Sequence, residues 1–275
     1  SALAAGNSVI LKPSEKTPHV SALILKMVSQ LFESHDVAVF EGGEKTVSEL
    51  LNNKFDHILY TGGTAVGQII MEKAAKTLTP VTLELGGKCP AVIDSSANIK
   101  EAAKKIAYFK FINVGQTCVA PDYVLIDEKL KDSFLESIAD YIYSMYGDID
   151  LIDKNKDYGR IVNQDHLKRL GSILDETLKS GDSLSLGGKY NQEDCFMSPT
   201  IIESSFNSPI MKEEIFGPLL PIMTFTDLKT IIDTINNQDK PLAAYYFGET
   251  KKDQETFLKQ LYFGGGCIND TVIHV

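Results

Sequence analysis

The stretch HILYTGGTAVG, residues 57–67, passes from a short apolar run through two glycines into a segment with helical spacing. A strand, a tight turn and a helix in this order are the first part of a βαβ unit. In this third of the chain, strands are expected at 8–12, 37–40, 57–60 and 81–84, and helices at about 20–31, 46–52 and 64–76. The pattern predicts a parallel sheet with crossover helices.

The rest of the chain also alternates between strands and helices, but less regularly. Strands are expected at 91–94, 123–127, 200–203, 219–224 and 243–247, and helices at about 99–111, 129–146, 164–179, 227–237 and 250–262. The pattern changes at Gly86-Gly87, which predicts two domains, residues 1–85 and 86–275. The expected fold class is therefore α/β throughout.

Composition limits the classes of partner. The 275 residues include 27 basic and 37 acidic side chains, which gives a formal net charge of −10 and a pI near 5.0. This balance argues against nucleic acid or an anionic membrane surface as a partner, because polyanions would be repelled. The four cysteines are far apart and form no CxxC pair, which is typical of a reducing compartment. We therefore expect a cytoplasmic protein.

The glycine pair Gly62-Gly63 is a candidate phosphate-binding turn. It lies between a predicted strand and a predicted helix, and a helix N-terminus favours a pyrophosphate. The segment is not GxGxxG, and it is not a P-loop, because Gln68 stands where that motif has lysine. The alternative is a tight turn without a ligand.

Cys118 is the candidate nucleophile. It ends the segment Asn113–Cys118, a short turn between a predicted helix and a predicted strand, where backbone N–H groups can point at the sulfur. Such donors would lower the pKa of the thiol and would also hold a developing oxyanion. The alternative is an inert buried thiol, which we assume for Cys89, Cys195 and Cys267.

Two charged residues close predicted strands. Glu84 precedes Gly86-Gly87-Lys88, so we expect a partly buried carboxylate whose pKa is raised towards that of a general base. Lys12 ends the first strand, at the edge of a parallel sheet that often faces a ligand. The alternatives are that Glu84 pairs with Lys88 or caps a turn, and that Lys12 belongs to a solvated charge pair. The histidines show no metal-ligand spacing, so no metal is expected.

Five motifs together resemble the aldehyde dehydrogenase family. They occur in the family's order and at about its separations: KPSE at Lys12–Glu15, YTGGT at Tyr60–Thr64, LELGGK at Leu83–Lys88, GQTC at Gly115–Cys118 and EEIFGP at Glu213–Pro218. Two further segments, Cys118–Tyr123 and Phe263–Asp270, are similar to the class-3 branch, which includes fatty and aromatic aldehyde dehydrogenases. The resemblance implies a Rossmann-like cofactor domain at 1–85 and an α/β catalytic domain at 86–275.

The resemblance also implies a reaction. Cys118 would attack the aldehyde to form a thiohemiacetal, loss of hydride would leave a thioester, and Glu84 would activate the water that hydrolyses it. The residues implied in cofactor binding are Lys12 and Glu15 for the adenosine ribose, Gly62 and Gly63 for the pyrophosphate, and Glu214 and Phe216 for the nicotinamide riboside. NAD is expected and NADP is the alternative, because Glu15 would compete with a 2′-phosphate.

Further implications concern the whole protein. The resemblance implies an aldehyde substrate, a homodimer at full length, and membrane attachment only through a C-terminal tail beyond this sequence. The family's oxyanion-hole asparagine should precede Lys12, and a Pro-Phe-Gly-Gly segment should follow Val275, so we expect the middle of a longer chain. Since one oxyanion donor is worth about 10²–10³ in rate, these residues alone should turn over little aldehyde.

Three residues depart from the family pattern. Gly63 stands in place of a serine, which removes a hydroxyl contact with phosphate but keeps the close backbone approach. Val114 and Cys89 replace smaller or hydroxylated residues, and we expect local repacking only.

Two alternative classes of function remain. A thiol acyltransferase or hydrolase would use Cys118 without nicotinamide, and a semialdehyde reductase that releases an acyl phosphate would not need Glu84. A non-catalytic protein on the same fold would leave Cys118 unreactive towards an alkylating agent. The presence of Glu84, Cys118 and Glu214 together argues against the non-catalytic alternative.

Overall fold

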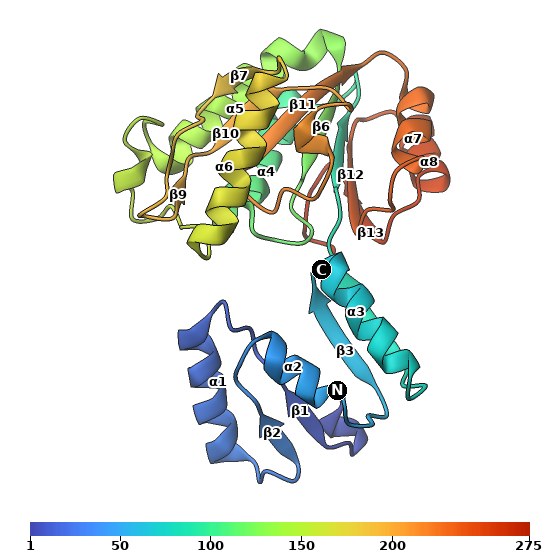
Figure 1. The fold of residues 1–275 in the computed structure, drawn as a ribbon. Helices are drawn as coiled ribbons and strands as arrows, with labels where there is room; N and C mark the ends of the chain where they lie inside the picture. The colour runs from blue at the N-terminus through green and yellow to red at the C-terminus, as the bar shows by residue number, and fades with distance from the viewer. The chain divides into compact units, whose positions relative to one another are not determined.

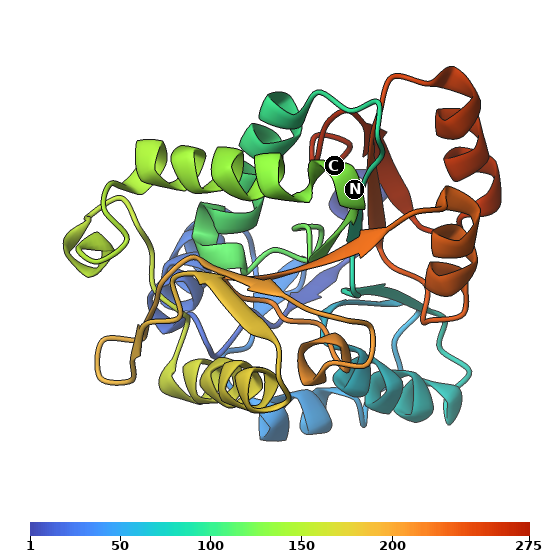
Figure 2. The same cartoon turned by 90° about the horizontal axis from the view of Figure 1, so that it is seen from above.

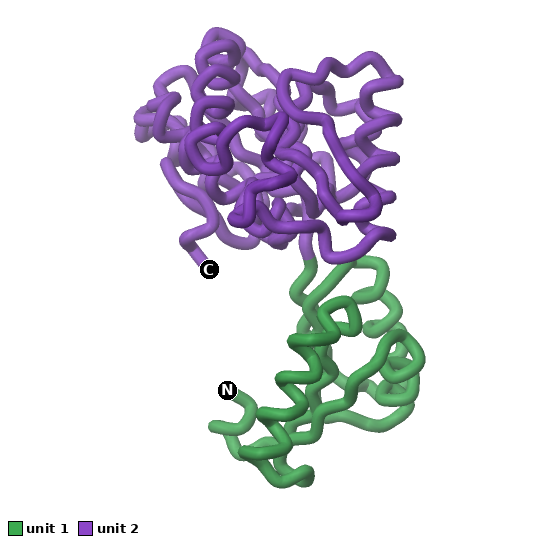
Figure 3. The backbone as a smooth tube through the Cα atoms, turned by 90° about the vertical axis from the view of Figure 1, so that its left-hand side faces the viewer, with its two compact units in different colours: residues 1–85 green, residues 86–275 purple.

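The computed structural model describes residues 1–275, which divide into two compact units, residues 1–85 and 86–275 (Figure 3). The division falls between Leu85 and Gly86, where the sequence pattern changes. No helix combines the length and the apolar character needed to cross a membrane.

The first unit contains short parallel strands and the helices that connect them (Figure 1). Its elements are β1 (Val9–Leu11), α1 (Pro18–Leu31), β2 (Val37–Val39), α2 (Glu44–Leu50), β3 (Ile58–Gly62), α3 (Thr64–Ala75) and β4 (Val81–Leu85). The strands form two parallel pairs, β1 with β2 and β3 with β4. The predicted parallel pairing is thus confirmed, but the sheet is in two pieces because β1 and β3 do not pair with each other.

The sequence explains how α3 packs on the β3–β4 pair. In β4, the side chains of Val81, Leu83 and Leu85 are half-buried, whereas those of Thr82 and Glu84 are exposed. This alternation is expected of a strand covered on one face. A Cβ on Gly67 of α3 would lie 2.8 Å from Leu85 Cδ2, so the glycine allows the helix to approach the strand closely.

The second unit is built on a seven-stranded sheet with the order β13-β12-β5-β6-β11-β10-β7. Its strands are β5 (Pro90–Ile93), β6 (Tyr123–Asp127), β7 (Ser183–Leu186), β10 (Thr200–Glu203), β11 (Leu219–Phe225), β12 (Ala243–Phe247) and β13 (Gly265–Ile268). Neighbouring strands are parallel except β7, which runs antiparallel to β10 at the edge. A separate antiparallel pair joins β8 (Tyr190–Asn191) to β9 (Phe196–Met197).

Helices cover both faces of this sheet (Figure 2). The helices are α4 (Ile99–Phe111) and α5 (Lys131–Tyr146) on one face, and α6 (Gln164–Lys179), α7 (Leu228–Asn236) and α8 (Lys251–Gln260) on the other. The central strands are therefore buried on both sides and are continuously apolar. In β5, Ala91 and Ile93 pack under α4 and α5, while Val92 belongs to the opposite core.

The helices and central strands lie within a few residues of their predicted positions, and α4 and α6 have the predicted bounds. The edge strands β7 and β13 and the β8–β9 pair were not predicted. β13 begins with Gly265 and Gly266, and a Cβ on Gly266 would lie 2.2 Å from the carbonyl oxygen of Ala244. Glycine is needed there for close strand contact, which hides the usual strand signal.

Candidate functional site

The candidate residues divide between the two units. The first unit contains Lys12, Glu15, Gly62, Gly63 and Glu84, and the second contains Cys118, Glu214 and Phe216. In the first unit, all of them lie at or just after the carboxyl ends of parallel strands. In the second unit, all of them lie before the amino ends of the neighbouring strands β6 and β11.

Lys12 and Glu15 form an ion pair after β1. Lys12 Nζ lies 2.8 Å from Glu15 Oε2 and also donates to the carbonyl oxygen of Gly42 at 3.3 Å. The hydrogen bond from Lys12 lowers the pKa of Glu15, so the carboxylate is ionised near neutral pH. A donor and an acceptor at one strand end are suited to a pair of ribose hydroxyls. The geometry also fits the solvated ion pair, the alternative prediction.

Gly62 and Gly63 form the turn between β3 and α3. Gly63 precedes the first residue of α3 in an extended conformation, with φ −73° and ψ 148°, and no side chain caps the helix. A Cβ on Gly63 would meet nothing within 4 Å. The helix carries no acidic residue in its first turn, and the nearest side chain to the glycine pair is that of Tyr60, whose hydroxyl lies against Gly62. This end of α3 fits a phosphate group.

Glu84 is exposed, so the prediction of a partly buried carboxylate is wrong. The strand alternation explains the difference, because Leu83 and Leu85 take the face against α3 and Glu84 takes the other. The alternative prediction, a Glu84–Lys88 pair, is also wrong. Lys88 Nζ is instead bonded to Asp122.

The turn that carries Cys118 has an unusual backbone. Asn113, Val114 and Gly115 have φ values of 50°, 57° and 74°, all in the left-handed region. The Gln116 side chain holds this turn, since its Nε2 donates to the carbonyl oxygens of Asn113 and Arg160, each at 3.0 Å. Cys118 is half-buried and not fully buried as in the inert alternative, with its position fixed by the turn before it.

Val114 is a strained residue in this turn. It is 1% exposed, and a β-branched side chain in the left-handed region is a genuine outlier. Its Cγ2 would be 3.0 Å from a Cβ on Gly159, so the side chain is also closely packed. Valine at this position therefore involves backbone strain in addition to the expected repacking.

Two of the sequence motifs, GQTC and EEIFGP, meet beside Cys118, and Cys89 lies next to them. A Cβ on Gly115 would lie 2.3 Å from the carbonyl oxygen of Gly217, which brings the turn before Cys118 against the EEIFGP segment. The thiol of Cys89 lies 3.5 Å from the carbonyl oxygen of Cys118. Cys89 is fully buried, and burial raises the pKa of its thiol to about 12. Cys89 is therefore a neutral, buried thiol, as assumed from the sequence. Cys195 and Cys267 were also assumed to be buried, but both are half-buried.

Glu214 lies against the Gly86-Gly87 turn. A Cβ on Gly86 would lie 2.3 Å from each carboxylate oxygen of Glu214. Burial and, second to it, the charge of Asp122 raise the pKa of Glu214 to about 7, against the opposing effects of the Gly87 N–H and Lys88. The pair of oxygens fits a hydroxyl-bearing ligand at this place, because a carboxylate accepts hydrogen bonds from hydroxyls.

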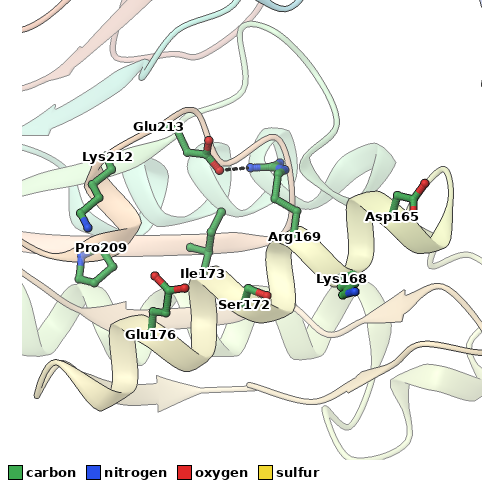
Figure 4. A pocket seen from close by; sticks show the side chains of 9 residues that line it. All are labelled: Asp165, Lys168, Arg169, Ser172, Ile173, Glu176, Pro209, Lys212 and Glu213. Carbon is green, nitrogen blue, oxygen red and sulfur yellow. Dashed lines mark hydrogen bonds and ion pairs between the residues drawn. The ribbon is translucent and has the colours of Figure 1, made fainter.

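A separate pocket of about 580 Å³ opens beside this segment (Figure 4). It is lined from α6 by Asp165, Lys168, Arg169, Ser172, Ile173 and Glu176, and otherwise by Pro209, Lys212 and Glu213. Arg169 points across it to Glu213, with Nη1 2.9 Å from Oε1. None of the residues predicted from the sequence to bind or react lines this pocket.

A sequence model of the aldehyde dehydrogenase family matches residues 1–275. The chain belongs to this family. The 4,4'-diaponeurosporen-aldehyde dehydrogenase of Staphylococcus aureus is 41% identical over 275 residues, and so is the dimeric NADP-preferring aldehyde dehydrogenase of Rattus norvegicus. Each match covers 100% of this chain and 59% of the relative. The chain thus spans well under two thirds of these aldehyde dehydrogenases.

Structural comparison agrees with the aldehyde dehydrogenase assignment. The substrate-bound state of Staphylococcus aureus AldH superposes with a TM-score of 0.95 at 40% identity, over 99% of this chain and 59% of that one. Aldehyde dehydrogenase family 3 member A2 of Mus musculus is 41% identical over 274 residues, covering 99% of this chain and 55% of the relative. The predicted fold class and the resemblance to the class-3 branch are confirmed.

Sequence reasoning missed Asp122 and Arg169 in this aldehyde dehydrogenase chain, and it assigned Lys88 the wrong partner. All three side chains bind the segment that contains Glu214. Asp122 lies only four residues after Cys118, in a segment already quoted for the class-3 resemblance. That position was the available signal, but the partner of Asp122 lies 93 residues away.

The raised pKa of Glu214 predicts a pH-dependent gain in stability for Glu214→Gln. In the folded chain Glu214 keeps its proton up to about pH 7, whereas in the unfolded chain it ionises near its ordinary value of 4.5. Glu214 therefore lowers the stability of the wild-type fold as the pH rises from about 4.5 to about 7, whereas a glutamine at this position does not titrate and has no such effect. We expect the melting temperature of Glu214→Gln, relative to wild type, to rise between about pH 5 and about pH 8.

The exposed Glu193 supplies the control for this measurement. Glu193→Gln makes the same change of charge and is expected to follow the wild-type pH profile. A Glu214→Gln profile that runs parallel to wild type over this range would contradict a raised pKa at Glu214.

Proposed function

We propose that this protein oxidises an aldehyde to a carboxylic acid, with a nicotinamide dinucleotide as hydride acceptor. The match of the aldehyde dehydrogenase family to all 275 residues carries this proposal. The half-buried Cys118 on a fixed turn supports it, because an accessible thiol is what covalent aldehyde chemistry requires.

Cys118 acts as the nucleophile. Its sulfur, as the thiolate, forms a bond to the aldehyde carbon, and the carbonyl oxygen becomes an alkoxide that the backbone N–H of Cys118 stabilises as one donor of an oxyanion hole. The nicotinamide, when bound, accepts the hydride that leaves this thiohemiacetal. The product at Cys118 is a thioester.

Glu84 acts as the base for hydrolysis. Its carboxylate removes a proton from water, the resulting hydroxide attacks the thioester carbon, and the Cys118 sulfur leaves as thiolate. A carboxylate suits this step because it activates water without being nucleophilic enough to compete with the thiol. The exposure of Glu84 leaves its carboxylate open to water.

The proposed cofactor contacts come from both units of the chain. In the first unit, Lys12 and Glu15 would hold the adenosine ribose, and Gly62 with Gly63 would admit the pyrophosphate at the start of α3. In the second, Glu214 would bind the nicotinamide ribose, with Phe216 beside the ring. We propose NAD as the preferred cofactor, because the ionised Glu15 repels a 2′-phosphate.

The test is an aldehyde assay with short aliphatic, long-chain and aromatic aldehydes, each with NAD and with NADP. The protein is used at a concentration similar to that of the cofactor, so that even a single turnover forms a measurable amount of reduced nicotinamide. We expect reduced nicotinamide to form, and to form faster with NAD. Ester or thioester cleavage without reduced nicotinamide would favour a hydrolase or acyltransferase instead. A protein inert to aldehydes and to thiol reagents would favour the non-catalytic alternative.

A further inference from the structure

Asp122 links three segments of the second unit. It is 4% exposed and lies directly before β6, four residues after Cys118. Its Oδ1 accepts the backbone N–H of Ile215 at 3.0 Å, and its Oδ2 accepts Lys88 Nζ at 2.5 Å. One buried carboxylate therefore connects the nucleophile segment, Lys88 just before β5, and the segment after Glu214.

Lys88 and Arg169 complete the hold on this segment. Lys88 Nζ also donates to the carbonyl oxygens of Ile210 and Glu213, at 3.1 and 3.0 Å, so its three protons are all used. The guanidinium of Arg169 donates to the carbonyl oxygens of Glu214 and Ile215, at 3.2 and 2.5 Å. Three side chains thus bind three consecutive carbonyls and one N–H of residues 213–215. We call Asp122, Lys88 and Arg169 the backbone clamp.

The conformation of residues 213–217 needs such a clamp. Phe216 has φ 50°, a left-handed conformation that a phenylalanine keeps only when its surroundings enforce it. The next residue, Gly217, has its carbonyl oxygen against Gly115, and the side chain of Glu214 lies against Gly86. A free segment would relax from this geometry, and the Glu214 carboxylate and the Phe216 ring would leave their positions.

The charges around Asp122 make it the central member of the clamp. Lys88 is largely buried, and Lys110 on α4 is 1% exposed. Burial lowers the pKa of Lys110 to about 8, and the negative charge of Asp122 opposes this shift. Without Asp122, these two cations would lose the nearby charge that compensates their burial.

We propose that Asp122 is a positioning residue for Glu214 and Phe216, acting through Lys88 and the backbone of residues 213–215. The proposal deepens the proposed function and rests on it for the cofactor role of Glu214. The clamp couples two parts of the active site, since Asp122 is also attached to the segment that carries Cys118. Asp122 itself contacts neither cofactor nor substrate in this scheme.

Asp122→Asn is the principal test. Asparagine can still accept the Ile215 N–H, but its amide then presents N–H groups to the ammonium of Lys88. Loss of a buried charge-assisted hydrogen bond changes an equilibrium constant by about tenfold or more. We therefore expect the Kd for reduced nicotinamide cofactor to rise about tenfold. We expect acylation of Cys118 by p-nitrophenyl acetate to change less than about twofold, because that step does not use Glu214.

Proteolysis gives a readout that does not depend on cofactor. Lys212 is exposed and directly precedes the clamped residues, so loosening of residues 213–216 should expose the Lys212–Glu213 bond to trypsin. We expect Asp122→Asn to be cut there about tenfold faster than wild type. The double variant Asp122→Asn/Lys88→Gln pairs amide with amide and is expected to recover part of both losses.

The control is an ion pair elsewhere in the same unit. Glu203 accepts from Lys131 at 2.6 Å, and Glu203→Gln removes the same kind of charge without touching residues 213–216. It is expected to leave cofactor affinity and cleavage unchanged. If Asp122→Asn behaves like Glu203→Gln in both readouts, the positioning role is wrong. If it does not fold, Lys88→Gln decides by the same two measurements.

The two proposals fail in different ways. If wild type binds no nicotinamide cofactor, the proposed function is wrong, while the proteolysis result still decides whether Asp122 holds the segment. If wild type binds cofactor and only proteolysis responds to Asp122→Asn, the clamp does not position Glu214 for the cofactor, and the proposal is overturned.

Discussion

Replacement of Cys118 by alanine is expected to abolish acylation of the protein. Alanine has no sulfur to attack a carbonyl carbon, and loss of a catalytic nucleophile typically costs about 10³-fold or more in rate. The structure of the turn should survive, because Gln116 and not the Cys118 side chain holds it. After mixing with p-nitrophenyl acetate, wild type should gain one acetyl group and release p-nitrophenolate, and Cys118→Ala should do neither.

Cys195→Ala is the matched control, since Cys195 is also a half-buried free cysteine. It should acetylate at the wild-type rate. Cys89→Ala should do so as well, because the raised pKa of the Cys89 thiol leaves it protonated at neutral pH. Acetylation that persists in Cys118→Ala and disappears in one of the other variants would assign the nucleophile to that cysteine instead.

The elements that the sequence predicted best are those whose signal is local. In α4 and α6, apolar residues recur at helical spacing over three or more turns, so both helices were predicted with their observed bounds. Buried parallel strands such as β6 also have a local signal, because burial on both faces makes them nearly continuous apolar runs. The edge strand β7 has mostly exposed residues, and its antiparallel pairing with β10 depends on residues far along the chain.

The residues of the candidate site also divide into those with a local sequence signal and those that depend on contacts far along the chain. Cys118 and the Gly62-Gly63 turn could be selected because their chemistry depends on the residue and its immediate neighbours. The environment of Glu84 was predicted wrongly, since strand alternation relative to α3 decides which face is covered. The backbone clamp could not be predicted, because its hydrogen bonds join residues 34 to 125 positions apart. Such contacts follow from the folded sheet order, which brings β5, β6 and β11 side by side.

Glu84→Gln is expected to separate acylation from hydrolysis. The substitution keeps the size of an exposed side chain and removes only its capacity to accept a proton from water, so it should cost little stability. Loss of a general base typically slows the dependent step by about 10²–10⁴-fold. We expect Cys118 to be acetylated at the wild-type rate in Glu84→Gln. The lifetime of the acetyl thioester, followed by mass spectrometry, should increase by about 10²–10⁴-fold.

Glu72→Gln, on the exposed surface of α3 in the same unit, controls for the change of charge and should hydrolyse its thioester like wild type. Hydroxylamine then distinguishes a missing base from a blocked thioester. It is a strong neutral nucleophile that needs no general base, so it should deacetylate Glu84→Gln and wild type at similar rates. If Glu84→Gln instead hydrolyses its thioester at the wild-type rate in water, Glu84 is not the base. A reductase that passes the acyl group to phosphate would then account better for a thiol nucleophile on this fold.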